Sequence, residues 1–218
     1  MHVGEKAPPI PAVKICGITT PEDALAAVEA GAQAIGLQFT EDSLRSVSPQ
    51  KAREIRKLIP PTVDVVGVFT HVTKETILGV AEYVGLDYVQ LHGDSSLGKF
   101  PIPTIAVVRV KAAEDLQPAA NLGGNMLLFD SKVEGKLGGT GQTFDWTILA
   151  GGAGRPFMLA GGLTPENVAK AIEITHPWAV DVSSGVEESP GRKSFSKMNS
   201  FVAAVKRTEP PHPKLSPL

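Results

Sequence analysis

The sequence of 218 residues contains a single cysteine, Cys16, which excludes an internal disulfide. It also has no marked excess of either charge: 21 Lys and Arg residues stand against 23 Asp and Glu residues. The formal net charge of −2 therefore gives no global attraction for nucleic acid or for an anionic membrane surface. No apolar run approaches the roughly 20 residues of a membrane span, and the N-terminus has no apolar signal-peptide core. These absences predict a cytoplasmic globular protein.

Several sequence motifs of cofactor and metal sites are also missing. No group of His and Cys shows zinc-ligand spacing, no Walker loop is present, and no G-x-G-x-x-G opens a helix. Only two tryptophans are present, so the chain has no obvious aromatic platform for nucleic acid. Any affinity for an anionic ligand must therefore come from local groups.

Short apolar runs alternate with amphipathic segments between two proline-containing ends. We expect flexible tails at 1–11 and 208–218, the second with four prolines in eleven residues. The apolar runs predict strands at 13–16, 34–39, 64–69, 87–91, 104–110, 126–130, 157–160 and 179–183. The amphipathic segments predict helices at 21–30, 49–59, 73–84, 112–120, 165–174 and 194–206, with weaker helical patterns after 91 and after 144. Thr20-Pro21, Ser48-Pro49 and Thr164-Pro165 each place a capping hydroxyl before a proline at the first helical position.

Eight strands that alternate with helices favour a parallel sheet, and eight is the number that closes such a sheet into a barrel. The sequence therefore predicts a single (β/α)₈ TIM barrel over 12–207. An open doubly wound sheet is the alternative on pattern alone.

Strand alternation places polar residues inside the predicted barrel. Side chains of a barrel strand point alternately to the lumen and to the helices, and active sites lie at the C-terminal strand ends. Because strands one and eight become neighbours on closure, we expect Lys14 and Asp181 to form a buried ion pair. Burial of such charges costs several kcal/mol unless they are paired. The residues expected to face the lumen are Lys14, Cys16, Gln90, His92, Asp130, Asp181 and Ser183.

Cys16 and Asp130 end their strands, which makes them candidates for proton transfer. A cation such as Lys14 near Cys16 would lower the pKa of the thiol and make the thiolate available as a base. Burial would raise the pKa of Asp130 and keep it protonated as an acid. Each residue also has a structural alternative: a free cysteine is often a buried apolar residue, and Asp130 precedes a glycine-rich loop where it would suit a cap or turn. His92 is likewise more often structural than catalytic at such a position.

Glycines after the last two strands predict a phosphate site. Gly161-Gly162 follows the seventh strand and Ser184-Gly185 follows the eighth, where many barrels bind phosphate through backbone N–H groups. The loop at 138–141 would fold over the same mouth as a lid. Arg45, after the second strand, would hold a carboxylate through its planar fork, or else lie in solvent. With such a ligand we expect Gln90, His92 and Asp181 to contact the substrate.

The chain resembles the phosphoribosylanthranilate isomerase family from about Val13 to Val205. The matching stretches are short but occur together and in order: 13-VKICGIT-19, 43-SLRSVSP-49, 66-VGVF-69, 89-VQLHG-93, 127-LLFDS-131, 138-GGTGQTFDW-146, 159-LAGGLTPENV-168 and 181-DVSSGVE-187.

The resemblance implies an Amadori rearrangement of a phosphoribosylanthranilate to a carboxyphenylamino-deoxyribulose phosphate, in tryptophan biosynthesis and without metal or organic cofactor. It implies that Cys16 is the general base, that Asp130 is the general acid and that Arg45 contacts the anthranilate carboxylate. The implied phosphate loops fall on Gly139, Gly161, Gly162, Ser184 and Gly185. The implied partner is a small-molecule substrate, with fusion to or association with other enzymes of the pathway as a further expectation.

Three positions depart from the family pattern. Asp42 stands where the family often has lysine and Ser46 where an aromatic residue is common, which weakens the case for a strongly cationic carboxylate pocket. Ser194 stands where aspartate is usual, and we interpret it as a different helix cap. The competing functional interpretations are another phosphate-binding barrel, such as an epimerase or synthase, and a non-catalytic barrel that binds a phosphorylated metabolite or forms a module of a multifunctional enzyme.

Overall fold

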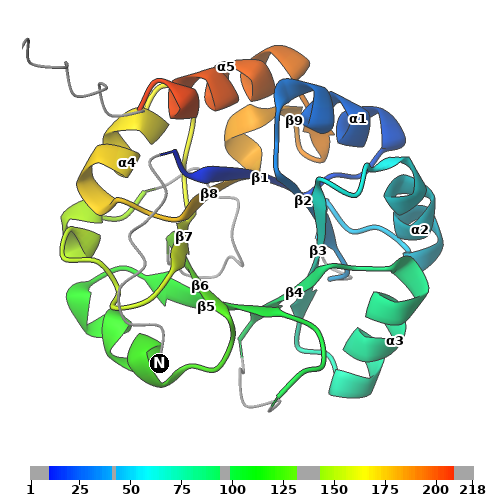
Figure 1. Cartoon of the computed structure of the whole chain (residues 1–218), viewed down its shortest axis with the longest axis horizontal. Coiled ribbons are helices and arrows are strands. Elements are labelled where there is room, and N and C mark those ends of the chain that lie inside the picture. Colours follow the sequence, from blue (N-terminus) through cyan, green and yellow to red (C-terminus); the bar gives the residue numbers. More distant parts are fainter. Residues whose placement is uncertain (1–9, 41–42, 94–98, 132–142, 209–218) are drawn as a thin grey trace, which may run out of the picture.

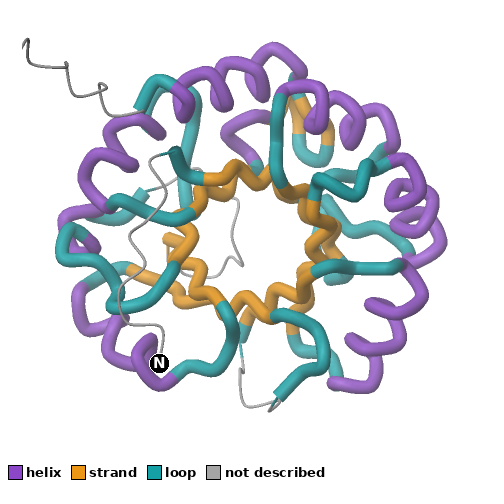
Figure 2. The backbone as a smooth tube through the Cα atoms, viewed as in Figure 1, coloured by secondary structure: helices purple, strands orange, loops and turns teal. Residues whose placement is uncertain are grey.

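The computed structural model describes residues 10–40, 43–93, 99–131 and 143–208. Eight parallel strands pair in chain order and the eighth pairs again with the first, which closes a barrel (Figures 1 and 2). This closed ring confirms the predicted TIM barrel and excludes the open sheet. The strands are β1 (Ala12–Cys16), β2 (Ala34–Gln38), β3 (Asp64–Thr70), β4 (Tyr88–His92), β5 (Thr104–Val110), β6 (Met126–Ser131), β7 (Phe157–Leu159) and β8 (Ala179–Val182).

Helices surround the strand ring (Figure 2), and most begin where the sequence predicts. Thr20, Ser48, Thr73 and Ser194 each accept a hydrogen bond from the backbone N–H three residues later, which satisfies a donor that the first helical turn leaves free. Ser194 is thus a helix cap, as interpreted. The α-helices among the described residues are α1 (Pro21–Ala30), α2 (Pro49–Leu58), α3 (Lys74–Val84), α4 (Val168–Thr175) and α5 (Phe195–Lys206).

The expected start of α4 is wrong by three residues. The helix begins at Val168 and its N-cap is Asn167, whereas Pro165 lies in a turn. The Asn167 side chain bonds backward instead: its Oδ1 accepts from the Thr164 N–H at 2.8 Å and its Nδ2 donates to the Gly162 carbonyl at 2.9 Å. Thr164 still accepts a cap-type bond, because its Oγ1 accepts from the Glu166 N–H at 3.3 Å and its carbonyl accepts from the Val168 N–H at 3.1 Å. The turn at 165–167 therefore leads directly into the helix.

Other connections also differ from the helices predicted for them. The segments after β5 and before β7 form 3₁₀ helices, η2 (Ala113–Asn121) and η3 (Trp146–Leu149). Of the segment after β4, residues 99–103 are described and contain no helix. After β8, the short helix η4 (Ser184–Val186) leads into an unpredicted antiparallel hairpin of β9 (Glu187–Ser189) and β10 (Arg192–Lys193).

The core has two layers, as strand alternation predicts. Outward-facing strand residues such as Ile15, Leu127 and Phe129 pack with the helices in one cluster. A second cluster fills the base of the lumen with Val66, Ile105, Val107, Leu128, Met158, Ala160 and Ala179. Apolar packing therefore fills part of the lumen, whereas the buried polar residues Lys14, Gln90, Asp130 and Asp181 lie in the middle or at the C-terminal end of their strands.

The predicted tails fall almost entirely outside the described residues, which leave out 1–9 and 209–218. Within the described part of the chain, no helix is both long and apolar enough to cross a membrane.

Candidate active site

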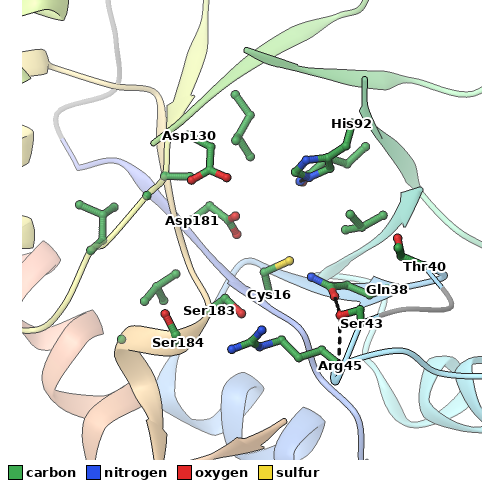
Figure 3. Close-up of a pocket in the computed structure, with 18 of the residues that line it drawn as sticks. Cys16, Gln38, Thr40, Ser43, Arg45, His92, Asp130, Asp181, Ser183 and Ser184 are labelled. Carbon is green, nitrogen blue, oxygen red and sulfur yellow. Dashed lines mark hydrogen bonds between the residues drawn. The ribbon is translucent and has the colours of Figure 1, made fainter. Parts of the chain in front are cut away.

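A pocket of about 450 Å³ opens at the C-terminal ends of the barrel strands (Figure 3). Strands β1, β2, β3, β4, β6 and β8 contribute residues to it, and the loops after β2, β7 and β8 complete its wall. Among the predicted site residues, the pocket brings together Cys16, Arg45, Gln90, His92, Asp130, Gly161, Gly162, Asp181, Ser184 and Gly185. Gly139, the lid at 138–141 and Asp42 lie outside the described residues.

The predicted ion pair between Lys14 and Asp181 is confirmed. The parallel register places these two residues side by side on β1 and β8. Lys14 Nζ donates to Asp181 Oδ1 at 2.8 Å, and the Lys14 side chain is only 1% exposed. A lysine this deeply buried requires its partner, so the pair fixes a positive and a negative charge at the floor of the pocket.

Cys16 lies above this pair, but its pKa shifts in the direction opposite to our prediction. Burial raises the pKa of the thiol above its ordinary value and outweighs the opposing charge of Lys14. The charge of Asp181 raises the pKa further, whereas Lys193 lowers it. The expected net depression of the Cys16 pKa is therefore wrong, because burial outweighs the lowering by Lys14 and the charge of Asp181 adds to the rise.

Asp130 has the raised pKa that burial predicts. Burial raises the pKa of Asp130 to about 6, although the charge of Arg109 opposes the shift. Arg109 Nη1 lies 3.8 Å from Asp130 Oδ2. Gly161 leaves room for this carboxyl, because a Cβ at Gly161 would lie 2.9 Å from Asp130 Oδ1. Asp130 is thus a strand residue of the pocket wall that is partly protonated near neutral pH, and not a helix cap.

His92 and Gln90 form a second polar group on the opposite wall. Burial, together with the charges of Arg109 and Lys14, lowers the pKa of His92 to about 4, so its imidazole is neutral at neutral pH. Gln90 Nε2 lies 3.0 Å from His92 Nε2. Gln90 Oε1 has no hydrogen-bond partner within the described part of the chain. This wall can therefore offer uncharged hydrogen-bonding groups to a ligand.

The Arg45 side chain packs against the backbone of Gly17, the residue after Cys16, on its way to the pocket. Gly17 has a φ of 74°, and a Cβ there would lie 2.6 Å from Arg45 Cδ, so a glycine is required at this point. Arg45 is paired rather than solvated: its Nε and Nη2 donate to the two carboxylate oxygens of Glu187 at 2.7 and 2.8 Å.

Arg109, Glu187 and Lys193 were not predicted as residues of the site. Ile105 and Val107 of β5 face the lumen, and Arg109 lies two residues further along the same strand. Strand alternation therefore could have predicted that Arg109 faces the lumen. Glu187 and Lys193 had no such signal, because β9 and β10 have only three and two residues.

The two predicted phosphate loops lie against each other at the pocket. Gly161 and Gly162 both have positive φ, at 85° and 67°, which a residue with a side chain adopts only with strain. A Cβ at Gly185 would lie 1.9 Å from the Leu163 carbonyl oxygen, so the loops after β7 and β8 touch backbone to backbone. Where glycines leave the backbone uncovered by side chains, its N–H groups can donate to a phosphate group.

Gly185→Ala should weaken phosphate binding by roughly tenfold to hundredfold, because the methyl group must push the two loops apart. Titration with inorganic phosphate measures the change. Gly79→Ala is the matched control: a Cβ at this exposed position of α3 meets nothing within 4 Å. That variant should bind phosphate normally and gain about 0.5–1 kcal/mol of stability. Unchanged phosphate affinity in folded Gly185→Ala would place the phosphate elsewhere.

The family model for N-(5′-phosphoribosyl)anthranilate isomerase matches residues 13–204 of this chain. The chain belongs to this family. A relative of that name from Neisseria meningitidis is 46% identical over 199 residues, which cover 89% of this chain and 96% of the relative. Another from Pseudomonas fluorescens is 46% identical over 200 residues, which cover 89% and 95%. The similarity thus spans the whole barrel, and the pocket described above belongs to an isomerase family.

Solved structures of this family have the same architecture. The phosphoribosyl anthranilate isomerase of Thermotoga maritima superposes with a TM-score of 0.85 at 42% identity, covering 91% of this chain and all of that one. A phosphoribosyl anthranilate isomerase in complex with reduced 1-(o-carboxyphenylamino)-1-deoxyribulose 5-phosphate superposes with a TM-score of 0.81 at 40% identity and the same coverage.

Among the described residues, no group of three or more His, Cys, Asp and Glu is arranged to hold a metal ion. The potential proton donors and acceptors of the pocket are its side chains.

Proposed function

We propose that this barrel converts N-(5-phosphoribosyl)anthranilate to 1-(2-carboxyphenylamino)-1-deoxyribulose 5-phosphate, with Asp130 as general acid and Cys16 as general base. The observation that carries the proposal is that the one cysteine shares a pocket with a carboxyl whose pKa burial raises to about 6. An Amadori rearrangement needs one group that gives a proton and another that takes one. Membership of the isomerase family supplies the substrate.

Asp130 acts first in this scheme. Its carboxyl gives a proton to the ring oxygen of the ribose, and the bond between that oxygen and C1′ breaks as the anilino nitrogen forms a protonated Schiff base. A pKa of about 6 leaves a useful fraction of Asp130 protonated near neutrality, whereas an ordinary aspartate would be almost fully ionised.

Cys16 completes the rearrangement. Its thiolate removes the proton from C2′, and the electron pair of that C–H bond moves to quench the iminium charge, which gives an enolamine. The enolamine then tautomerises to the ketone. Lys14 supports this step because its charge favours the thiolate and opposes part of the effect of burial.

The remaining pocket residues would bind the substrate. Arg45 would contact the anthranilate carboxylate through N–H groups that Glu187 does not use. The loops at Gly161-Gly162 and Ser184-Gly185 would hold the phosphate, with Gly139 as a further contact. Gln90, His92 and Asp181 would contact the sugar hydroxyls from the pocket wall.

The direct test adds phosphoribosylanthranilate to the purified chain and follows the loss of anthranilate-type fluorescence. A second assay asks whether the gene rescues a tryptophan auxotroph that lacks this isomerase. We expect turnover and rescue. Failure of both with folded protein would favour a different phosphate-binding barrel or a barrel that only binds a phosphorylated metabolite.

The two pKa shifts predict a bell-shaped pH dependence of kcat/KM. The reactive form has protonated Asp130 and ionised Cys16, and it is a minority because the pKa of Asp130 lies below that of Cys16. Its population should rise with pH up to about 6, stay level, and fall once the thiol ionises. Rates measured from about pH 5 to 10 check this shape. An acid limb at the pKa of a thiol would contradict the assigned order of the two pKa values.

We also propose a cytoplasmic location, which rests on the sequence composition, and fusion to or association with other enzymes of tryptophan biosynthesis, which rests on the family resemblance.

A further inference from the structure

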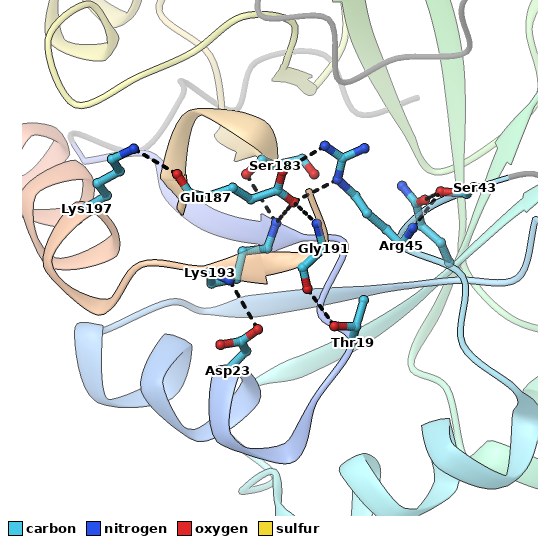
Figure 4. Close-up of polar contacts among 10 residues, drawn as sticks. Thr19, Asp23, Ser43, Arg45, Ser183, Glu187, Gly191, Lys193 and Lys197 are labelled. Carbon is cyan, nitrogen blue, oxygen red and sulfur yellow. Dashed lines mark hydrogen bonds and ion pairs between the residues drawn. The ribbon is translucent and has the colours of Figure 1, made fainter. Parts of the chain in front are cut away.

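A buried cluster of three charged side chains lies directly behind the pocket wall (Figure 4). It consists of Arg45 from the loop after β2, Glu187 at the start of β9 and Lys193 at the end of β10. Their side chains are 15%, 5% and 0% exposed. Glu187 and Lys193 are buried and are paired across the β9–β10 hairpin, whereas Arg45 is partly buried and lines the pocket. Burial of charged groups costs free energy unless they are paired.

Glu187 fixes the orientation of the Arg45 guanidinium. Both of its carboxylate oxygens accept from one edge of the guanidinium, formed by Nε and Nη2. This two-point contact holds the plane as well as the position of the group. The other edge of the guanidinium, formed by Nη1 and the second hydrogen of Nη2, carries two further donors. Arg45 lines the pocket (Figure 3). That edge has the geometry to accept a second carboxylate.

Lys193 gives the cluster a net positive charge. Its Nζ donates to Glu187 Oε1 at 2.9 Å and to the Ser183 carbonyl at 3.1 Å. The neighbouring carboxylate of Asp23 accepts from the Lys193 backbone N–H at 3.2 Å and not from its ammonium. An Arg45–Glu187 pair alone would be neutral and would attract an anion weakly, whereas protonated Arg45 and Lys193 on one carboxylate leave one unit of positive charge among these three side chains. Burial lowers the pKa of Lys193, and the charge of Glu187 opposes this shift.

The same segment also carries a phosphate loop. Ser184 and Gly185 form η4, and Glu187 follows it directly. Further bonds brace this segment: Lys197 Nζ donates to the Glu187 carbonyl at 2.8 Å, and Thr19 Oγ1 donates to the Gly191 carbonyl at 2.6 Å. Arg45 is therefore held at a fixed position relative to the phosphate loop, as recognition of a ligand with two anionic groups requires.

We propose that Glu187 and Lys193 are positioning residues that make Arg45 selective for the ring carboxylate of the substrate. Glu187 aims the free edge of the guanidinium at the pocket, and Lys193 supplies the charge that keeps the edge attractive to an anion. This role rests on the proposed function. It predicts that the chain discriminates between ligands with and without the aromatic carboxylate.

The test measures the affinity of two probes, the reduced carboxyphenylamino-deoxyribulose phosphate and its phenylamino counterpart without the carboxylate. The wild-type chain should prefer the carboxylated probe by at least about tenfold, the effect of one partly buried charge. Lys193→Met removes the ammonium. It should lower the affinity for the carboxylated probe about tenfold and leave the affinity for the other probe within about twofold of wild type.

Glu187→Gln separates positioning from charge. The substitution makes the cluster more positive, so a purely electrostatic role predicts tighter binding of the carboxylated probe. It also turns one accepting oxygen into an amide that faces a guanidinium N–H, so a positioning role predicts weaker binding, by about tenfold. Glu188→Gln is the matched control, because the Glu188 side chain is 54% exposed and pairs with Arg192 at the surface. It should bind both probes normally.

Several outcomes would overturn the proposal. Equal losses for the two probes would indicate a merely structural role, and tighter binding in Glu187→Gln would remove its positioning role. A wild-type chain without preference for the carboxylate would refute the proposal even if both variants fail to fold. Turnover of phosphoribosylanthranilate by the wild-type chain is measured separately. Failure of turnover would overturn the proposed function, whereas turnover without carboxylate preference would overturn this inference alone.

Discussion

Asp130→Asn is expected to lower kcat by roughly 10²–10⁴-fold, the usual contribution of a general acid. The amide is close to the carboxyl in shape, but it has no acidic proton to give to the ribose ring oxygen. Fluorescence-monitored turnover measures kcat, and affinity for the reduced product analogue shows whether the pocket is intact. A kcat within about tenfold of wild type would rule out Asp130 as the acid.

The same variant should not lose stability at neutral pH. The pKa of Asp130 is about 6 in the folded chain, against an ordinary value of 3.8, so the folded state holds the proton more tightly than the unfolded state. The ionised carboxylate therefore destabilises the fold, and this cost develops as the pH rises from about 4 to 6. The shift corresponds to ~3 kcal/mol, as an order of magnitude.

An amide at position 130 removes that cost, so Asp130→Asn should melt at the same temperature as wild type or higher at pH 7. At pH 4 the advantage should vanish, because Asp130 is then protonated in the folded chain. Thermal unfolding at the two pH values checks the sign. A variant that is inactive but no less stable would identify Asp130 as a residue retained for chemistry, because its burial costs stability.

Most of the site residues could be predicted from the alternation of side chains along the strands. Lys14 and Asp181 are 167 positions apart, yet their pairing was predictable because parity sends both inward and closure makes their strands neighbours. The same rule placed Cys16, His92 and Asp130 in one lumen. A period of two residues is reliable in a barrel because one face of every strand packs against helices.

Features that depend on competition between distant groups were not predictable in this way. The pKa of Cys16 reflects burial, Lys14, Asp181 and Lys193 together, and parity supplied only the first two charges. The start of α4 was predicted three residues too early because residues 165–167 form a turn, in which the Asn167 side chain bonds the Thr164 N–H and the Gly162 carbonyl. The Arg45–Glu187 contact spans 142 positions and joins the loop after β2 to the three-residue strand β9, where no periodicity is visible.

Cys16→Ala is the second substitution with a large expected effect, a loss of roughly 10²–10⁴ in kcat. Without the thiolate, no group at the end of β1 can remove the C2′ proton. The loss of the Sγ atom leaves a small void against Gly36, where a Cβ would lie only 2.6 Å from that sulfur. The stability cost should be about 1 kcal/mol, too small to unfold the barrel.

Cys16→Ser is the matched variant because it keeps nearly the same volume and a hydrogen-bonding group beside Lys14, but its hydroxyl does not ionise near neutral pH. We expect it to bind the reduced product analogue and to be as inactive as Cys16→Ala. Since Cys16 is the only cysteine, the ultraviolet absorbance of the thiolate reports its ionisation without interference from another thiol. We expect a pKa above the ordinary thiol value, in the direction that burial sets.

That titration also decides how the base works. If the thiol ionises above its ordinary value and the serine variant binds but does not turn over, then only the minority of molecules with ionised Cys16 and protonated Asp130 carries the reaction. Substantial activity in either Cys16 variant would instead assign the C2′ proton to another group of the pocket. His92 would then be the first residue to test, because it lines the same pocket and its imidazole is neutral, although burial lowers its pKa to about 4 and makes it a weak base.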